Sequence, residues 1–341
     1  MKRTYQHGFA CMMLAVSPFM LTVEPAHAQP PPPPPCTDSA EDICGQLAPE
    51  DLVAVGSDWV AASAYSGSGG LALVSTRDRS TRIVYPAASA RNRHDEATYP
   101  DCPSPPSAGF QTHGLYVLPG NGPIYKIFAV AHGPRESIEV FTVDTSATEP
   151  VATWIGCAIA PDPIGLNSVR GLEDGGFITT NFQDRGEAQS AFGEIMNGKV
   201  NGQLWEWHTD SGWQIVPGSE ASGANGIELS ADGSMLYVAA WGSQSFFTLS
   251  RGTASPERRE IPLGFRIDNI HWASDGRLWG AGQGTNGWEV VKIDPGNMTV
   301  ERIATVANSP GFAAGTAVVE VGDDLWVGSF RGNRIRVIPA P

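Results

Sequence analysis

The feature that most constrains the fold is a strand–turn–strand unit that recurs along the chain. Residues 223–247 show it most clearly, with an alternating apolar strand, an Asp232-Gly233 turn and a returning apolar run at 235–238. Similar units lie around Asn167 and Asn269. Each begins with an amide or carboxylate side chain that has no packing role in a strand. Units of this kind indicate modules arranged around a shared centre.

The spacing of the units predicts the fold class. Corresponding positions fall near residues 52, 113, 167, 225, 269 and 316, roughly 44 to 61 residues apart. This is the spacing of four-stranded propeller blades, so we predict an all-β, six-bladed β-propeller over residues 46–341. With 39 Gly, 27 Pro and only 17% charged residues, the chain has the composition of a turn-rich β protein with little helix. A pair of β-sandwiches is the alternative architecture.

The N-terminus has the pattern of an export signal. Lys2-Arg3 precede an apolar stretch at 9–23, and Ala26-His27-Ala28 fits a small-x-small cleavage site. We therefore expect residues 1–28 to be a signal peptide, residues 29–45 to be a Pro-rich linker, and the protein to be periplasmic or extracellular. No other stretch reaches 18 apolar residues, so no transmembrane segment is predicted.

Four cysteines follow the predicted cleavage site, and an even number in an exported chain favours two disulfides. Three connectivities are possible, of which Cys36–Cys44 with Cys102–Cys157 is preferred. A cysteine metal site is the weaker alternative because the chain has no Cys-x-x-Cys pair.

The formal net charge of −14 and the lack of a basic stripe exclude nucleic acid as an expected partner. The acidity is explained by a solvated acidic surface, or in part by a cation site. The composition predicts no particular oligomeric state.

Blade geometry brings distant residues together. The inner strand of every blade presents its first residues at one mouth of the central tunnel, so polar residues at the unit starts are expected to converge. These residues are Glu50-Asp51, His113, Asn167, Asn225 and Asp268-Asn269.

Five of these positions form a set of hard oxygen donors that suits Ca²⁺. The predicted ligands, which together carry two negative charges, are Glu50, Asn167, Asn225, Asp268 and Asn269. A backbone carbonyl, water or substrate oxygen would complete six to eight ligands. Each asparagine taken singly has another explanation as a turn or capping residue; it is their recurrence at equivalent positions that predicts a central metal site.

The order of several motifs resembles the serum paraoxonase/arylesterase family. These are EDL at 50–52, THGLYV at 112–117, AVAHGPRESIEVFTVD at 129–144, the Leu166-Asn167 strand, GANGIELSADGSMLYVAAW and IDNIHWASDGRLW. The Asn-Gly-Ile…Leu-Tyr-Val hairpin by itself resembles only the broader senescence-marker-protein/gluconolactonase superfamily. The resemblance runs from about Glu50 to the end of the chain.

The resemblance implies a propeller with a catalytic calcium ion held by Glu50, Asn167, Asn225, Asp268 and Asn269. It also implies a histidine dyad at His113 and His132. A second, structural calcium ion of that family is held partly by the residue that matches Asp51. The Asn-Asp pair of the family is Asn167-Ser168 here, so one charged ligand of that second ion is missing. No Cys follows Cys157, so closure between the ends of the chain must depend on strand pairing.

These features predict hydrolysis of a small-molecule lactone or related ester, with Ca²⁺ polarising the carbonyl and His113 activating water. An imidazole near its ordinary pKa of about 6.5 would suit that role. His113 could instead only bind substrate, and His132 could only support His113. The lack of a Gly-x-Ser-x-Gly motif excludes a serine hydrolase of that type. The alternatives are a non-catalytic exported propeller that binds a small ligand or protein, and a propeller enzyme similar to strictosidine synthase.

Substrate choice is expected to depend on two loops over the tunnel, at 91–110 and 183–202. Trp241, which follows the Asn225 hairpin, is expected near the mouth. His94, His208 and His271 are given no role.

Overall fold

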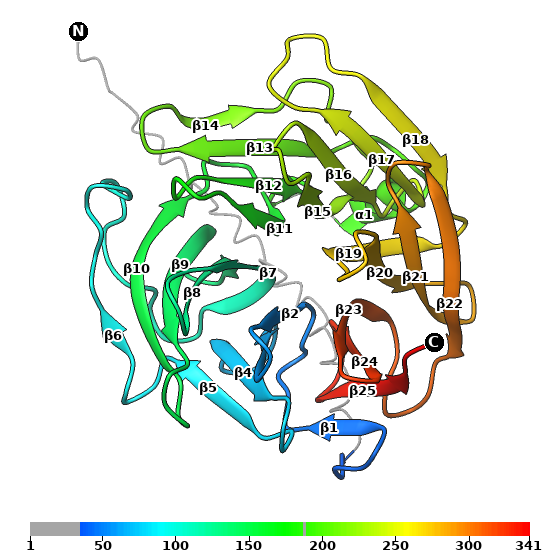
Figure 1. Ribbon diagram of the computed structural model, residues 1–341. Coiled ribbons are helices and arrows are strands. Elements are labelled where there is room, and N and C mark those ends of the chain that lie inside the picture. The colour runs from blue at the N-terminus through cyan, green and yellow to red at the C-terminus, as the bar shows by residue number, and fades with distance from the viewer. Residues whose placement is uncertain (1–34, 187–188) are drawn as a thin grey trace, which may run out of the picture. The chain divides into compact units, whose positions relative to one another are not determined.

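Six β-sheets follow one another around a central axis in the computed structural model (Figure 1). The structure describes residues 35–186 and 189–341. Five sheets have four strands and one has five, and strands that are consecutive in sequence pair antiparallel. This is a six-bladed β-propeller, as the repeat predicts, and not a pair of β-sandwiches. The predicted signal peptide lies outside the described residues.

In blades one to six, each blade begins with the strand nearest the axis. These inner strands are β2 (Leu52–Val55), β7 (Gln111–Pro119), β11 (Leu166–Gly171), β15 (Ala224–Leu229), β19 (Arg266–Trp272) and β23 (Gly315–Val321). The second strands are β3 (Trp59–Ser63), β8 (Ile124–His132), β12 (Phe177–Asn181), β16 (Met235–Ala240), β20 (Leu278–Gln283) and β24 (Asp324–Ser329).

Two further strands complete each blade toward the outside. The third strands are β4 (Leu71–Ser75), β9 (Ser137–Asp144), β13 (Gln203–His208), β17 (Ser245–Ser250), β21 (Gly287–Asp294) and β25 (Arg334–Pro339). The outer strands are β5 (Thr81–Tyr85), β10 (Val151–Ile159), β14 (Gly212–Ile215), β18 (Arg258–Pro262), β22 (Thr299–Ala307) and β1 (Asp42–Cys44). A short parallel strand, β6 (Arg91–Asn92), is added outside β10.

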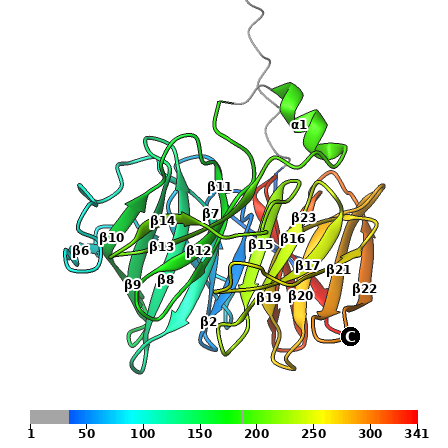
Figure 2. The ribbon, with the colours of Figure 1, turned by 90° about the horizontal axis from the view of Figure 1, so that it is seen from above.

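One helix, α1 (Gln189–Met196), lies between β12 and β13 of the third blade. Figure 2 shows it above the sheets, on one face of the propeller. Among the described residues, no helix is long and apolar enough to cross a membrane.

The two ends of the described chain meet in the sixth blade. β1 pairs antiparallel with β25, in the register Asp42↔Arg336 to Cys44↔Arg334. Asp42 also accepts hydrogen bonds from both arginines, at 3.1 Å from Arg334 and 2.9 Å from Arg336. Closure by strand pairing is therefore confirmed. The pairing of β1 also corrects the predicted boundary between the linker and the propeller. Part of the 29–45 segment is a blade strand, so the propeller begins before residue 46.

Large apolar side chains fill the spaces between blades. Trp279 and Trp288 of blade five pack with Val318 and Leu325 of blade six in one buried cluster. Other clusters join blades four and five, and blades six and one. Burial of each such side chain contributes roughly 1.5–3 kcal/mol. These contacts hold the inner strands in place around the axis.

Both preferred disulfides, Cys36–Cys44 and Cys102–Cys157, are present in the structure. The first joins residues eight positions apart beside β1, and the second links the loop after β6 to β10 across 55 positions. Two disulfides are consistent with an oxidising, exported environment.

Loss of the longer cross-link is expected to cost more stability than loss of the shorter one. On loop-closure entropy, Cys102→Ser with Cys157→Ser should lower the free energy of unfolding by about 4 kcal/mol, and Cys36→Ser with Cys44→Ser by about 2.5 kcal/mol. Urea unfolding of the two double variants under oxidising conditions measures the difference. Equal losses, or the reverse order, would show that native packing around Cys36 outweighs loop entropy.

Candidate active site

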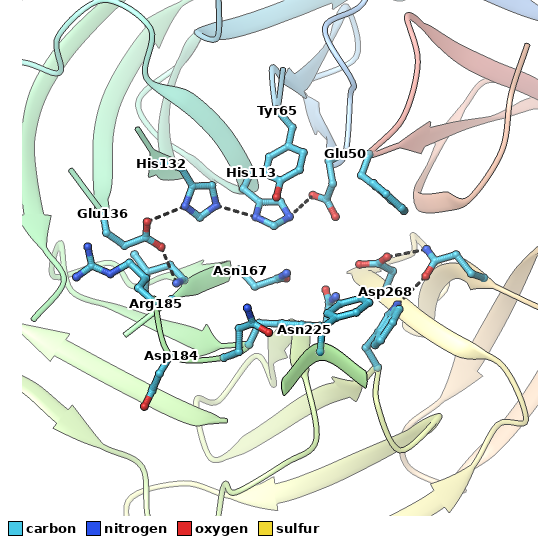
Figure 3. A pocket seen from close by; sticks show the side chains of 18 residues that line it. Glu50, Tyr65, His113, His132, Glu136, Asn167, Asp184, Arg185, Asn225 and Asp268 are labelled. Carbon is cyan, nitrogen blue, oxygen red and sulfur yellow. Dashed lines mark hydrogen bonds and ion pairs between the residues drawn. The ribbon is translucent and has the colours of Figure 1, made fainter. Parts of the chain in front are cut away.

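A cavity of about 360 Å³ lies at the mouth of the tunnel where the inner strands begin (Figure 3). Glu50, His113, Asn167, Asn225 and Asp268 all line it. Five blades thus contribute one predicted site residue each. Of the residues expected to converge at the blade starts, these five lie around one cavity, whereas Asp51 and Asn269 are not among its lining residues.

A β-bulge in the inner strand explains how these side chains reach the cavity. In five of the six inner strands the pairing register shifts at the same point, so that two residues of the inner strand oppose one of the next. The shifts lie at 112–115, 166–169, 224–227, 267–270 and 315–318. His113, Asn167, Asn225 and Asp268 each sit in the bulge of their strand. A bulge re-aims side chains, here toward the axis.

Two bulge residues are glycines because the inner strands approach one another closely. A Cβ added at Gly114 would lie 2.5 Å from the carbonyl oxygen of Asn167, and one at Gly226 would lie 2.5 Å from that of Asp268. Any larger residue would push neighbouring blades apart at the site. The Asn225-Gly226 pair thus combines a cavity-facing amide with the space that the adjacent blade requires.

The predicted oxygen donors, four of which line the cavity while Asn269 lies beside Glu50, are buried and incompletely hydrogen-bonded. Four of their oxygens have no hydrogen-bond partner, namely Glu50 Oε2, Asn167 Oδ1, Asn225 Oδ1 and Asn269 Oδ1. Each of these four residues is at most 7% exposed. An unpaired buried oxygen costs roughly 1–3 kcal/mol, so four at one place need a common partner. The donor set fits a hard cation, which would accept them all.

The remaining contacts orient these donors. The Asn269 amide donates to Glu50 Oε1 at 2.8 Å, which turns Glu50 Oε2 and Asn269 Oδ1 away from that bond. Gln283 donates to Asp268 Oδ2 at 2.7 Å. Trp241 Nε1 donates in turn to Gln283 Oε1 at 2.6 Å.

The two carboxylates have strongly raised pKa values. Burial, followed by repulsion from Asp51, raises the pKa of Glu50 to about 8, although the Asn269 hydrogen bond opposes the rise. Burial and the charge of Glu50 likewise raise the pKa of Asp268 well above its ordinary value. Buried carboxyl groups that repel one another are typical of a functional site, and a cation between them would favour their charged forms.

Among the described residues, no three His, Cys, Asp or Glu side chains form a metal-binding group. The predicted donor set has two carboxylates and three amides, so its fit to a cation depends on the amide oxygens.

A chain of hydrogen bonds runs from Glu136 through His132 to His113, whose ring then faces Glu50. Glu136 Oε2 lies 2.8 Å from His132 Nδ1, and His132 Nε2 lies 2.9 Å from His113 Nδ1. His113 Nε2 then faces Glu50 Oε2 at 3.5 Å. The His113 end of this chain faces Glu50, one of the predicted oxygen donors, as Figure 3 shows.

The chain determines which ring nitrogens carry protons. The carboxylate of Glu136 accepts a hydrogen bond from Nδ1–H of His132, which leaves Nε2 of His132 as an acceptor. His113 Nδ1–H can donate to that nitrogen, so His113 Nε2 keeps its lone pair and directs it toward the cavity. The expected dyad of His113 and His132 is thus extended by a carboxylate.

The expectation of an ordinary pKa for His113 is wrong. Burial lowers the pKa of His113 to about 4, against the opposing effect of Asp51 and Glu136. The ring is only 8% exposed and stacks on Tyr65, with 4.3 Å between ring centroids. His113 is therefore neutral at pH 7, which is the form that can accept a proton.

Asp51, the predicted ligand of a second ion, is fully buried and does not line the cavity. It contacts His271, with 2.7 Å between Asp51 Oδ1 and His271 Nε2. Burial alone would lower the pKa of His271, but Asp51 and Glu228 raise it to about 10. His271, which was given no role from the sequence, thus forms a buried ion pair between blades.

Three aromatic residues that pack together form one part of the apolar cavity wall. Phe182, Phe192 of α1 and Trp241 pack against one another, with 5.5 to 6.3 Å between ring centroids. Trp241 lies at the mouth as expected, and Gln183, Asp184 and Arg185 of the predicted 183–202 loop also line the cavity. The other predicted loop does not, because β6 fastens it to the outer edge of blade two.

Sequence reasoning missed Glu136, Tyr65 and Gln283. Glu136 lies four residues after His132 in the turn between β8 and β9, where a charged residue is ordinarily solvent-exposed. Instead it is 7% exposed, and its Oε1 accepts a hydrogen bond from the Leu166 backbone at 2.7 Å. The His-x-x-x-Glu spacing was the only available signal.

Solved structures share this fold at low sequence identity. A gluconolactonase from Xanthomonas campestris is 14% identical, with a TM-score of 0.57 over 94% of this chain and 99% of that one. A luciferin-regenerating enzyme is 15% identical, with a TM-score of 0.56 over 87% and 94%. A streptogramin B lyase is 10% identical, with a TM-score of 0.51 over 88% and 97%. No family model and no curated protein matches the chain. These likenesses show the six-bladed propeller fold.

Proposed function

We propose that the protein is a calcium-dependent hydrolase that opens a lactone or cleaves a related ester. The four unpaired buried oxygens of Glu50, Asn167, Asn225 and Asn269 carry the proposal. The proposed calcium ligands are these residues together with Asp268. The gluconolactonase among the structural neighbours, which shares the fold, supports the reaction class.

A bound calcium ion would polarise the ester carbonyl and stabilise the negative charge that develops on its oxygen. The protein supplies the rest of the chemistry. His113 Nε2 accepts a proton from a water molecule as that water attacks the carbonyl carbon. The bond from that carbon to the ring oxygen breaks, and the same proton passes to this oxygen, which gives a hydroxy acid.

His132 and Glu136 support the base. When His113 takes up a proton, His132 accepts a hydrogen bond from its Nδ1–H, and Glu136 holds His132 in that tautomer. The aromatic wall of Phe182, Phe192 and Trp241 excludes water from one side of the cavity and offers an apolar surface to the substrate.

The test is turnover of a panel of lactones and aryl esters by the purified protein, in calcium and after chelation. We expect hydrolysis in calcium, loss with chelator, and recovery when calcium is restored. In ¹⁸O water, hydrolysis places the label in the carboxylate product. Product without label would indicate an elimination, the reaction class of a lyase. No turnover of any substrate, with calcium bound, would favour the alternative of a non-catalytic propeller.

Glu136→Gln is expected to lower kcat about 10–100-fold with little change in calcium affinity. The glutamine amide at position 136 can donate a hydrogen bond to His132 Nδ1. His132 is then no longer held in the tautomer that accepts a hydrogen bond from His113 Nδ1–H, so the lone pair of His113 Nε2 is no longer kept facing the cavity. The matched control is Glu206→Gln, because Glu206 also contacts a histidine, His208, at 2.7 Å but lies outside the cavity. Equal rates for the two variants would contradict the role of Glu136.

A further inference from the structure

Both oxygens of the buried Asp51 carboxylate, which does not line the cavity, already have partners in the protein. Its Oδ1 accepts a hydrogen bond from the Leu52 backbone at 2.8 Å and lies 2.7 Å from His271 Nε2. Its Oδ2 accepts one from the Leu115 backbone at 2.8 Å. Asp51 thus differs from its neighbour Glu50, whose Oε2 has no hydrogen-bond partner.

His271 bridges Asp51 to a second buried carboxylate. Its other ring nitrogen, Nδ1, lies 3.6 Å from Glu228 Oε1. Arg170 Nε lies 3.1 Å from Glu228 Oε2, and the Arg170 guanidinium covers the ring of Tyr116 at 4.0 Å. The group formed by His271, Glu228 and Arg170, which we call the inner cluster, joins blades five, four and three to Asp51 of blade one.

The second carboxylate that the resemblance implies for the structural calcium ion is replaced by a neutral side chain. Ser168 stands where the resemblance implies a carboxylate, and it is 2% exposed. Its backbone N–H donates to Thr180 Oγ1 at 2.9 Å, and its carbonyl accepts from Thr179 Oγ1 at 2.7 Å. These bonds use the backbone of Ser168 within its own blade.

We propose that the inner part of the tunnel holds no metal ion, because the inner cluster takes the place of the second calcium ion that the resemblance implies. The side chain of His271 occupies the free coordination direction of Asp51 and ties the blades together as a bound ion would. The residues therefore do not fit a second calcium ion. The proposal does not require the hydrolase activity, although the expected presence of one ion in the outer cavity rests on the proposed function.

Calcium stoichiometry of the full chain tests the proposal directly. Protein freed of metal by a chelator, and then freed of the chelator, is titrated with calcium chloride by calorimetry, and its bound calcium is counted by elemental analysis. We expect one ion per chain. Two ions would overturn the proposal. If no ion binds, the inner position is metal-free as proposed, and the proposed function is contradicted instead. The two failures are therefore distinguishable.

A variant designed to create a second calcium site provides the second test. Ser168→Asp combined with His271→Ala frees Asp51 and restores a second carboxylate, so we expect a second calcium-binding event and a count of two. A folded double variant that still binds one ion would contradict the role given to His271. If this variant does not fold, the count for the unmodified protein still decides.

His271→Gln alone should lower Tm by about 5–10 °C, because it leaves two buried carboxylates without their common partner. The matched control is His208→Gln. His208 also lies between two carboxylates, Asp174 and Glu206, but at the surface with 31% of its side chain exposed, and we expect a change of about 2 °C or less. Equal shifts would show that His271 does not join the blades.

Discussion

Replacing Asn225 by alanine is expected to weaken calcium binding and ester hydrolysis together, by orders of magnitude. Asn225 is 3% exposed, and its Oδ1 has no hydrogen-bond partner in the protein. Removing one hard ligand from a set with only two carboxylates leaves too little charge and too few oxygens to replace the hydration of the ion. We expect calcium affinity and kcat/KM each to fall about 10²–10³-fold, on the several kcal/mol that a metal contributes to transition-state stabilisation.

The experiment pairs calcium titration with hydrolysis rates, both measured on chelator-treated protein to which calcium is returned. Without calcium, the Tm of Asn225→Ala should stay close to that of the unmodified protein, whereas the Tm increase on adding calcium should be lost. Asn297→Ala is the matched control, because Asn297 is an exposed turn residue that donates hydrogen bonds to Asp294 and does not line the cavity. Unchanged turnover in Asn225→Ala would exclude the proposed metal role.

Replacing His113 by glutamine is expected to separate catalysis from metal binding. His113 Nε2 is the base in the proposed reaction, and glutamine has no group that takes up a proton near neutral pH. We expect kcat to fall about 10²–10⁴-fold, which is the usual contribution of general acid–base catalysis. Calcium affinity should change little, because the five proposed ligands all remain.

His94→Gln is the control for this variant. His94 is partly buried and lies 5.4 Å from Trp154 between ring centroids, outside the cavity. Steady-state rates and calcium titration of both variants provide the comparison. If His113→Gln raises KM and leaves kcat unchanged, His113 binds the substrate and another group activates the water.

The repeated units contain most of the information about the fold. Alternating apolar strands and Asp-Gly turns are local features, and a blade is built from strands that are neighbours in sequence. The closing strand is different. Asp42–Cys44 is only three residues long, and its hydrogen-bond partner Arg334 lies 292 positions away from Asp42. Strand propensity over three residues carries little information, so a linker was predicted there.

The positions of the oxygen donors were also readable, because each stands at the start of a unit and the propeller makes unit starts converge. The contacts that the residues at the unit starts make could not be predicted from the sequence. The bulges that re-aim Asn167, Asn225 and Asp268 depend on pairing with the second strand of each blade. The histidine chain depends on a turn that buries Glu136 against blade three, and the low pKa of His113 on its burial.

The sequence by itself determined the six blades and the residues that face the axis, because both follow from short-range periodicity and the symmetry of the repeat. Only the tertiary structure decided the partner of each buried polar group. Asp51 and Glu50 are adjacent in the chain. Both carboxylate oxygens of Asp51 have partners, which are His271 and two backbone amides, whereas Glu50 keeps one unpaired oxygen. That difference arises between blades, where residues far apart in sequence meet in a medium that penalises every unpaired charge.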